Sequence, residues 1–375
     1  MDFSSRRFFG MALSFVPGMN ALFVRRLEEQ GISPEEFFAL PQLELSERLD
    51  IRNSRSLDKM LRDEALFRAR KEVEKIEHHG IRTLSLTDED YPERLRDIDK
   101  APVTLYVLGP ADLNAQRMIS VVGTRHATSY GLRYVDRLIA ELKPYCPQLA
   151  VVSGLALGID SAAHIAALDQ GLPTIAVVAH GLNTIYPAQN RDLARRIISS
   201  GGALVSEYPF GTSPYRSRFL ERNRIVATMT DAVLIAESAE KGGAMSTAAV
   251  ASSYSREVFA LPGRVGDEMS AGCNRLIRSQ KAMMAGTAAE FVAALGWQSD
   301  AVKLPVDQPV LFPELCGKEK SVYDCLRFAG EPMPIDSLRE RTGLPIHDLM
   351  ACLGEMEFDG IIERLPGSRF ALIRY

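Results

Sequence analysis

Glycine, hydroxyl and arginine residues follow directly after several short apolar runs of this sequence. Gly123, Thr124 and Arg125 come after the first such run, and Ser153 and Gly154 lie at the end of the second. Glycine lets the backbone approach a phosphate closely, a following helix N-terminus offers free N–H groups, and arginine adds a fork of donors. These residue types in this order are typical of a site that holds phosphate groups.

Two further runs end in similar residues. Ser206–Glu207 closes one of them, and Lys241–Thr247, which contains Gly242, Gly243 and Ser246, follows the other and opens a helical stretch. A glycine after a strand is by itself more often only a tight turn. Four such ends on one sheet edge predict a groove for phosphates or a nucleotide backbone, because a doubly wound sheet places alternate loops around one crevice.

An arginine-rich run with interleaved aromatic residues occupies 214–225. It holds four arginines against one glutamate, together with Tyr215 and Phe219. Cations for phosphates and ring faces for bases are what single-stranded DNA binding requires. The alternative is an amphipathic helix with solvated arginines, and it accounts for some of these residues, Arg222 among them. The residues expected to bind single-stranded DNA are Gly123, Thr124, Arg125, Ser153, Gly154, Arg216, Phe219, Asn223, Arg224, Gly242, Gly243 and Ser246.

The elements that must position these residues form a strand–helix alternation from about 119 to 263. Short runs rich in Val, Ile, Leu and Ala, most of them followed by Gly or Ser and a helical stretch, predict parallel strands covered by helices on both faces. The expected fold is α/β, an extended Rossmann-like, doubly wound, mostly parallel sheet. The expected strands are 119–122, 150–153, 174–178, 203–206, 232–236 and 258–261.

Smaller modules are expected on both sides of this domain. Residues 1–70 show helical spacing of apolar residues and predict a small helical domain, of the sterile-alpha-motif or helix-hairpin-helix kind. The Rossmann-like domain then covers 71–298, and the proline-containing segment 299–318 is expected to be a linker. Residues 319–375 read as three short helices and two strands around a Pro-Gly-Ser turn, which is the pattern of a winged helix.

The composition predicts a cytoplasmic protein. Its 375 residues carry a net charge of −4, so any DNA site is a local patch on a mildly acidic body. The five cysteines are scattered without Cys-x-x-Cys spacing, which indicates a reduced chain without a zinc site. Arg6-Arg7 before an apolar run resembles a twin-arginine signal, but Pro17-Gly18 breaks the run and a first helix is expected instead. No stretch reaches the ~18 apolar residues of a membrane span.

Enzymatic readings find weaker support in the sequence. There is no Gly-x-x-x-x-Gly-Lys-Ser/Thr loop and no Gly-x-Gly-x-x-Gly after the first strand, so an NTPase or a dinucleotide cofactor is not expected. Asp160 and His164 lie four residues apart and are interpreted as a structural pair, since no third metal ligand is evident. Glu207 and Glu237 keep a carboxylate enzyme open as an alternative. We expect no catalysis, no cofactor and no metal.

Seven motifs in order resemble the DNA-processing protein A (DprA/Smf) family over about residues 80–300. The segments that carry the resemblance are Val122-Gly123-Thr124-Arg125, Ser153-Gly154-x-Ala156-x-Gly158-Ile159-Asp160-x-x-x-His164, Tyr186-Pro187-x-x-Asn190, Ser206-Glu207-Tyr208-Pro209, Phe219-x-x-Arg222-Asn223-Arg224-Ile225, Gly242-Gly243-x-Met245-Ser246-Thr247, and Pro262-Gly263 with Gly272-Cys273-Asn274-x-Leu276-Ile277.

The resemblance implies a homodimer formed through the Rossmann-like domain. It also implies that the protein binds and protects incoming single-stranded DNA in natural transformation and recombination, and loads RecA onto it. In the family, the Gly-Thr/Ser-Arg loop and a cation before the Phe-x-x-Arg-Asn-Arg motif hold phosphates, and the phenylalanine lies against a base. Carried onto this chain, these are Gly123, Thr124, Arg125, Arg216 and Phe219.

Three alternatives remain beside this expectation. The Gly242-Gly243-x-Met245-Ser246-Thr247 loop resembles the phosphate loop of lysine-decarboxylase-like phosphoribohydrolases, for which Glu207 or Glu237 would be the acid. A second alternative is a scaffold for competence proteins. The winged helix could read duplex DNA, but 346–359 holds no Lys or Arg and four acidic residues, so we expect it to contact protein.

Overall fold

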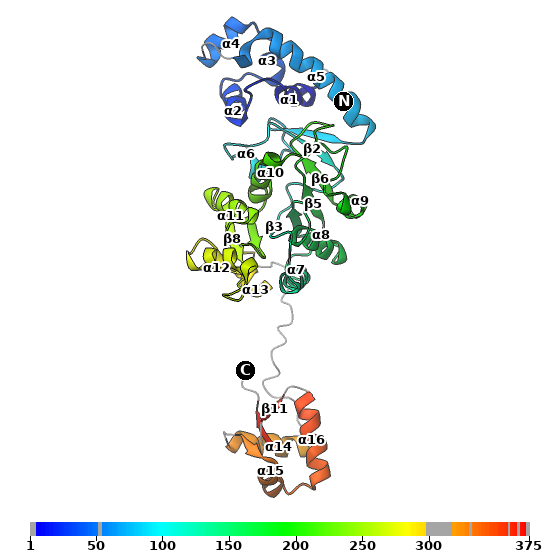
Figure 1. The fold of residues 1–375 in the computed structure, drawn as a ribbon, viewed down its shortest axis with the longest axis vertical. Coiled ribbons are helices and arrows are strands. Elements are labelled where there is room, and N and C mark those ends of the chain that lie inside the picture. The colour runs from blue at the N-terminus through cyan, green and yellow to red at the C-terminus, as the bar shows by residue number, and fades with distance from the viewer. Residues whose placement is uncertain are drawn as a thin grey trace. The chain divides into compact units, whose positions relative to one another are not determined.

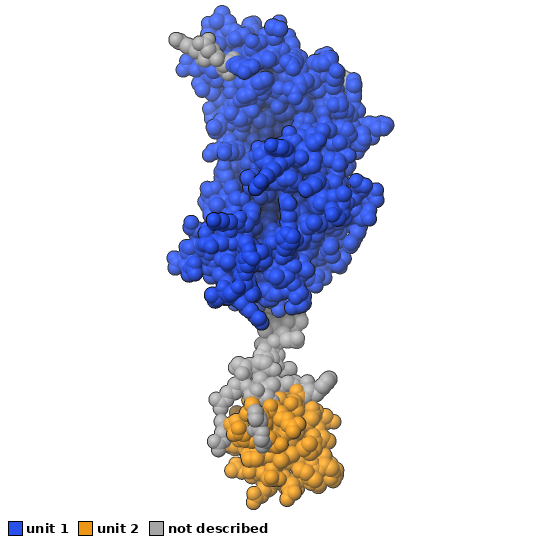
Figure 2. Space-filling view, in the orientation of Figure 1, with its two compact units in different colours: residues 1–300 blue, residues 301–375 orange. Residues whose placement is uncertain are grey.

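The computed structural model describes residues 5–51, 55–297, 317–329, 332–358, 361–365 and 368–372. The chain divides into two compact units, residues 1–300 and 301–375, coloured separately in Figure 2. Most of the expected linker 299–318 lies outside the described residues. Among the described residues, no helix is both long and apolar enough to cross a lipid bilayer.

The first unit is built on a nine-stranded sheet of order β1-β2-β6-β5-β4-β3-β7-β8-β9. The strands from β6 to β9 in this order are parallel, and β1 and β2 form an antiparallel extension at one edge. The strands are β1 (Arg82–Ser85), β2 (Thr104–Leu108), β3 (Met118–Val122), β4 (Ala150–Ser153), β5 (Thr174–Val177), β6 (Ala203–Ser206), β7 (Ala232–Ile235), β8 (Glu257–Ala260) and β9 (Met283–Met284).

Helices cover both faces of the central strands, which are apolar on both sides (Figure 1). One face packs against α7 (Ser129–Leu142), α8 (Ile159–Asp169) and α13 (Ala288–Ala294). The other packs against α9 (Arg191–Ser199), α10 (Arg216–Thr228), α11 (Gly243–Ser253) and α12 (Ala271–Arg278). Strands buried on both faces form near-continuous hydrophobic runs. The expected doubly wound, mostly parallel α/β fold is therefore confirmed.

All six expected strands are present, and three more extend the sheet. β1 and β2 lie before residue 119, where we expected no strand, and β9 is only two residues long. β1 has the sequence Arg-Thr-Leu-Ser, which shows neither a hydrophobic run nor a helical pattern. It is a strand because its backbone pairs with β2, which in turn pairs with β6. Pairing between distant segments supplied what local sequence did not indicate.

The N-terminal residues form helices α1 (Arg6–Leu13), α2 (Ala21–Glu29), α3 (Pro34–Ala39), α4 (Gln42–Leu49) and α5 (Lys59–His78). The residues that resembled an export signal begin α1, whose Phe8 and Met11 are buried. The apolar cores of these helices and of one sheet face form a single cluster. The predicted boundary at residue 70 falls inside α5, so this helix runs from the predicted helical domain into the predicted Rossmann-like domain. A short helix α6 (Glu93–Arg96) precedes β2.

The second unit has its own small core. Helices α14 (Gly317–Ala329), α15 (Ile335–Thr342) and α16 (Ile346–Phe358) pack with a three-stranded sheet of order β10-β12-β11. The strands are β10 (Met333–Pro334), β11 (Ile362–Leu365) and β12 (Arg369–Leu372), and β11 and β12 form the expected hairpin. Three helices and this sheet make the winged helix that the sequence predicted.

Candidate nucleic-acid interface

The loops after β3, β4 and β7 meet at the point where the order of strands reverses. β3 lies between β4, the next strand in the chain, and β7, which returns to it from the far side of the sheet. Open α/β sheets bind ligands at such a point, outside the carboxyl ends of the strands. Here the loops and the start of α10 enclose a cavity of about 930 Å³, at the upper end of the usual size of ligand pockets.

The loop after β3 is held tightly from two sides. The Thr124 N–H donates to the carbonyl of Glu237 at 2.7 Å, and the Ile159 N–H donates to the carbonyl of Thr124 at 3.2 Å. A Cβ on Gly123 would lie 2.6 Å from the Ile159 side chain and 2.9 Å from the Glu237 carbonyl. Only glycine fits there, so this loop is a rigid wall of the cavity, and it places Arg125 at the opening.

The loop after β4 is tied to the buried carboxylate of Asp160. Asp160 Oδ2 accepts from the N–H groups of Gly154 at 3.2 Å and Ala156 at 3.3 Å. A Cβ on Gly154 would collide with the guanidinium of Arg222, which also donates to the carbonyl of Val177. The Gly154 N–H is therefore already satisfied, and Gly154 serves by letting Arg222 approach.

Arg222 and Asp160 share a site with very little solvent. Both line the cavity and are almost fully buried, at 4% and 7% exposure. Burial raises the pKa of Asp160, while Arg222 and the two backbone N–H groups oppose the rise. Burial likewise lowers the pKa of Arg222, and Asp160 opposes that change. Because Arg222 is buried and donates to the carbonyl of Val177, it is less accessible to a ligand than the exposed cations of the cavity.

His164, expected to be structural, is fully buried one turn after Asp160. Its Nδ1 lies 2.7 Å from the hydroxyl of Thr174, and burial lowers the pKa of His164 to about 3. The described residues include no group of three or more His, Cys, Asp or Glu that could hold a metal ion.

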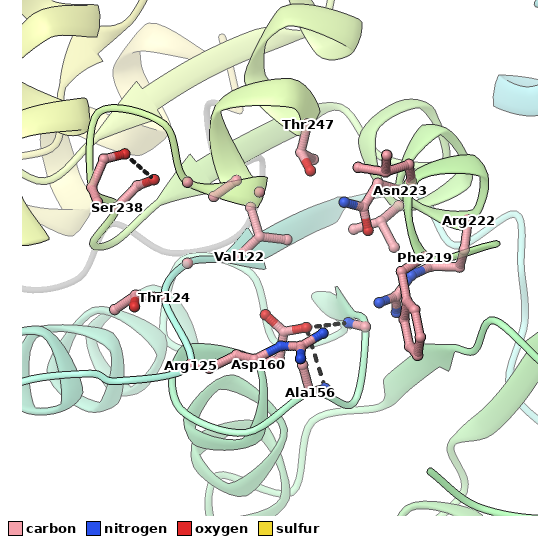
Figure 3. Close-up of a pocket in the computed structure, with 18 of the residues that line it drawn as sticks. Val122, Thr124, Arg125, Ala156, Asp160, Phe219, Arg222, Asn223, Ser238 and Thr247 are labelled. Carbon is pink, nitrogen blue, oxygen red and sulfur yellow. Dashed lines mark hydrogen bonds between the residues drawn. The ribbon is translucent and has the colours of Figure 1, made fainter. Parts of the chain in front are cut away.

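Three side chains form an aromatic and cationic wall at the opening of the cavity. The Arg125 guanidinium lies over the ring of Phe219, 5.6 Å from its centroid, and Tyr186 lies beside Phe219 with 5.6 Å between ring centroids. Figure 3 shows Arg125 and Phe219 facing each other across the cavity from different elements. A cation and a ring face next to each other can hold a phosphate and a base of the same nucleotide.

The exposed cation that helix α10 contributes to the cavity lies in the first turn of the helix. Arg216, Phe219 and Asn223 line the cavity. Arg224 points elsewhere, because both of its terminal nitrogens donate to the carboxylate of Glu207, at 2.9 and 2.5 Å. The predicted role of Arg224 in DNA binding therefore finds no support from its position.

Helix α11 presents its N-terminus to the cavity. Gly242 is its N-cap residue, and Lys241, Gly242 and Gly243 all line the cavity. The free N–H groups of a helix N-terminus favour an anion. Ser246 does not take part in this wall: it is exposed and its hydroxyl donates to the carbonyl of Gly243. Thr247, the next residue, faces the cavity instead.

Nine of the twelve predicted site residues line one cavity, and three do not. Ser153 is fully buried and donates to the carbonyl of Val121, and Arg224 and Ser246 are engaged as described. Among the lining side chains that the prediction omitted are Tyr186, Arg222, Lys241 and Thr247. Lys241 adjoins the glycine pair and was the one with a clear signal in the sequence. Tyr186 is far from Phe219 in the sequence, and only the fold brings the two side chains together.

Both carboxylates of the enzymatic alternative have partners within the protein. Glu237 accepts from the Thr128 N–H at 2.8 Å and from the Thr128 hydroxyl at 2.5 Å, and it is 2% exposed. Glu207 is bound by Arg224 on both oxygens. Neither glutamate is among the residues that line the cavity.

The chain matches known protein families. Residues 82–296 match the family model of DNA recombination-mediator protein A, and residues 311–368 match that of the DprA winged helix domain. Protein Smf of Escherichia coli is 36% identical over 317 residues, which is 80% of this chain and 79% of that protein.

Two solved structures resemble this one. The DNA processing protein A of Streptococcus pneumoniae gives a TM-score of 0.58 at 32% identity, over 73% of this chain and 97% of that one. A Helicobacter pylori DNA processing protein A, described for its single-stranded DNA binding mode, gives 0.51 at 31% identity, over 57% and 95%. The family match, which spans the sheet and every loop of the cavity, shows that this chain belongs to the DNA recombination-mediator protein A (DprA/Smf) family of DNA processing proteins.

Proposed function

We propose that this chain binds single-stranded DNA in the cavity at the strand ends. The observation that carries the proposal is the meeting of Arg125, Arg216 and Lys241 with the ring of Phe219 around one opening. The cations neutralise phosphates, and the ring stacks on a base without selecting its identity. The described DNA-binding mode of the Helicobacter pylori relative supports the same conclusion.

A labelled oligonucleotide tests the proposal directly. Fluorescence anisotropy with single-stranded and duplex forms of one sequence, across a salt series, should show tighter binding of the single strand at every salt concentration. Affinity should fall as salt rises, because bound phosphates release counterions. Equal affinity for both forms, or an affinity that does not respond to salt, would refute it.

We further propose that the protein protects incoming DNA and loads RecA in natural transformation and recombination, as the family resemblance implies. The chain needs no catalytic step for this, and its two candidate carboxylates are engaged in structural bonds. The test is filament assembly: RecA should form filaments on strands covered by single-strand-binding protein only when this chain is added. Release of free base from nucleoside monophosphates would instead support the hydrolase alternative.

The proposed homodimer would use the sheet edge at β9. Met283 and Met284 on this strand are 38% and 61% exposed, and β9 pairs with β8 on one side only. An unpaired strand edge with exposed apolar side chains favours association. Light scattering should give twice the mass of one chain, and Met284→Lys should shift it towards the monomer.

The winged helix is proposed to contact protein. Helix α16 carries Asp348, Glu355 and Glu357, and Asp348 pairs with Lys318 of α14 at 2.9 Å. A recognition helix with these charges would be repelled by phosphate. Binding of duplex DNA by an isolated 305–375 fragment at moderate salt would overturn this assignment.

A further inference from the structure

Several polar side chains in the cavity wall make no hydrogen bond to another described residue. Among them are Asn223 on α10 and Thr247 on α11, two helices that pack against each other. Thr247 is only 2% exposed, yet its hydroxyl is not bonded to protein. Figure 3 shows both side chains reaching into the open space between the loops.

The unpaired Thr247 hydroxyl differs from its neighbours. Hydroxyls within a helix commonly donate to a carbonyl one turn back, and Ser246 and Ser253 of α11 do so with Gly243 and Val250. Thr228 of α10 does the same with Arg224. The hydroxyl oxygen of Thr247 keeps access to the cavity, although the residue as a whole is buried. A ligand that fills the cavity shuts this oxygen off from water and must therefore supply a hydrogen bond in its place.

The chemistry of this pair fits a base better than a phosphate. The Asn223 amide presents a donor and an acceptor side by side, and the Thr247 hydroxyl can act as either. A phosphate only accepts, so the amide oxygen would face another oxygen. The cations that suit phosphate, Arg125, Arg216 and Lys241, belong to other parts of the wall. The edge of a base carries donors and acceptors together.

The position of Asn223 points to the same ligand. It lies four residues after Phe219 on α10, so the two side chains are neighbours on one face of the helix. Resting on the proposed function, we propose that Asn223 and Thr247 hydrogen-bond the Watson–Crick edge of a base stacked on Phe219. An amide that turns about its last bond can pair with any base, so the contact selects no sequence. It does require an unpaired edge, which a duplex cannot offer.

The test uses oligothymidine in which every base is thymidine or N3-methylthymidine. The methyl group removes the N3–H and blocks the Watson–Crick edge, but it leaves the phosphate charge and the ring face in place. The wild-type chain should bind the methylated strand about tenfold more weakly, the scale of one lost hydrogen bond. The double variant Asn223→Ala, Thr247→Val should bind both strands equally, at about the wild-type affinity for the methylated one.

Ser253→Ala is the matched control, since its hydroxyl lies on the same helix but outside the cavity wall and bonds to Val250. It should keep the full difference between the two strands. Equal binding of both strands by the wild type, or the same tenfold difference in the double variant, would overturn the inference while single-strand binding itself stands. Failure of the wild type to bind any single strand would overturn the proposed function and the inference with it. Thermal melting of each variant checks that it is folded.

Discussion

Removing one cavity cation should change how binding depends on salt by a calculable amount. Four cationic side chains line the cavity within the described residues: Arg125, Arg216, Arg222 and Lys241. Arg222 is almost fully buried, whereas Arg125, Arg216 and Lys241 are exposed, so three charges are accessible to phosphates. Each phosphate neutralised on a single strand contributes about −0.7 to the slope of log K against log salt. The wild-type slope from this cavity is therefore about −2.

Arg125→Ala and Arg216→Ala should each reduce this slope to about −1.4. Between 50 and 200 mM salt, the wild-type affinity then falls about 20-fold and that of each variant about sevenfold. The assay is anisotropy of a labelled single strand at four or more salt concentrations. The slope is the informative quantity, because Arg125→Ala also removes the contact with the Phe219 ring and lowers affinity for a second reason.

Arg195→Ala supplies the control. Arg195 is exposed on α9, pairs with Asp192 and lies outside the cavity wall, so its loss should leave the slope unchanged. If neither cavity variant changes the slope, or if Arg195→Ala changes it equally, then the single strand does not bind at this cavity.

Other predictions concern the ring of Phe219, the buried carboxylate of Asp160 and the buried His164. Phe219→Ala should weaken single-strand binding about 5- to 150-fold by loss of stacking, while Phe219→Tyr keeps it; equal affinities for all three chains would count against stacking. Asp160→Ala should lower the free energy of unfolding in urea by about 1–3 kcal/mol, because it leaves the N–H groups of Gly154 and Ala156 without their acceptor; a change below about 0.5 kcal/mol would contradict this role. Burial lowers the pKa of His164 from 6.5 to about 3, so only the unfolded chain takes up this proton between these values. The free energy of unfolding should therefore fall as pH drops through that window, by up to about 1.4 kcal/mol per pH unit. The fall should be less steep in His164→Asn, whose side chain can still bond Thr174. Identical pH slopes for the two chains would exclude this contribution.

The sequence was enough to predict the sheet and the place of the site. Apolar runs such as 119–122 and 232–236 are strands because both of their faces are buried, and such runs are visible without a structure. The reversal of strand order follows from the fold class, so Gly123, Gly154 and Gly242 could be expected at one crevice. The winged helix was equally visible, since its helices and hairpin are local patterns.

Only the tertiary structure decided which of these groups remain free to bind. Asp160 accepts a hydrogen bond from the Gly154 N–H, and Glu207 forms an ion pair with Arg224. Both contacts depend on how α8 and α10 pack on the sheet. A difference of one position on α11 turns Thr247, rather than Ser246, towards the cavity. Local sequence indicates the type of each side chain, but hydrogen-bond partners come from segments far apart in the chain. Their geometry is set when helices pack against strands.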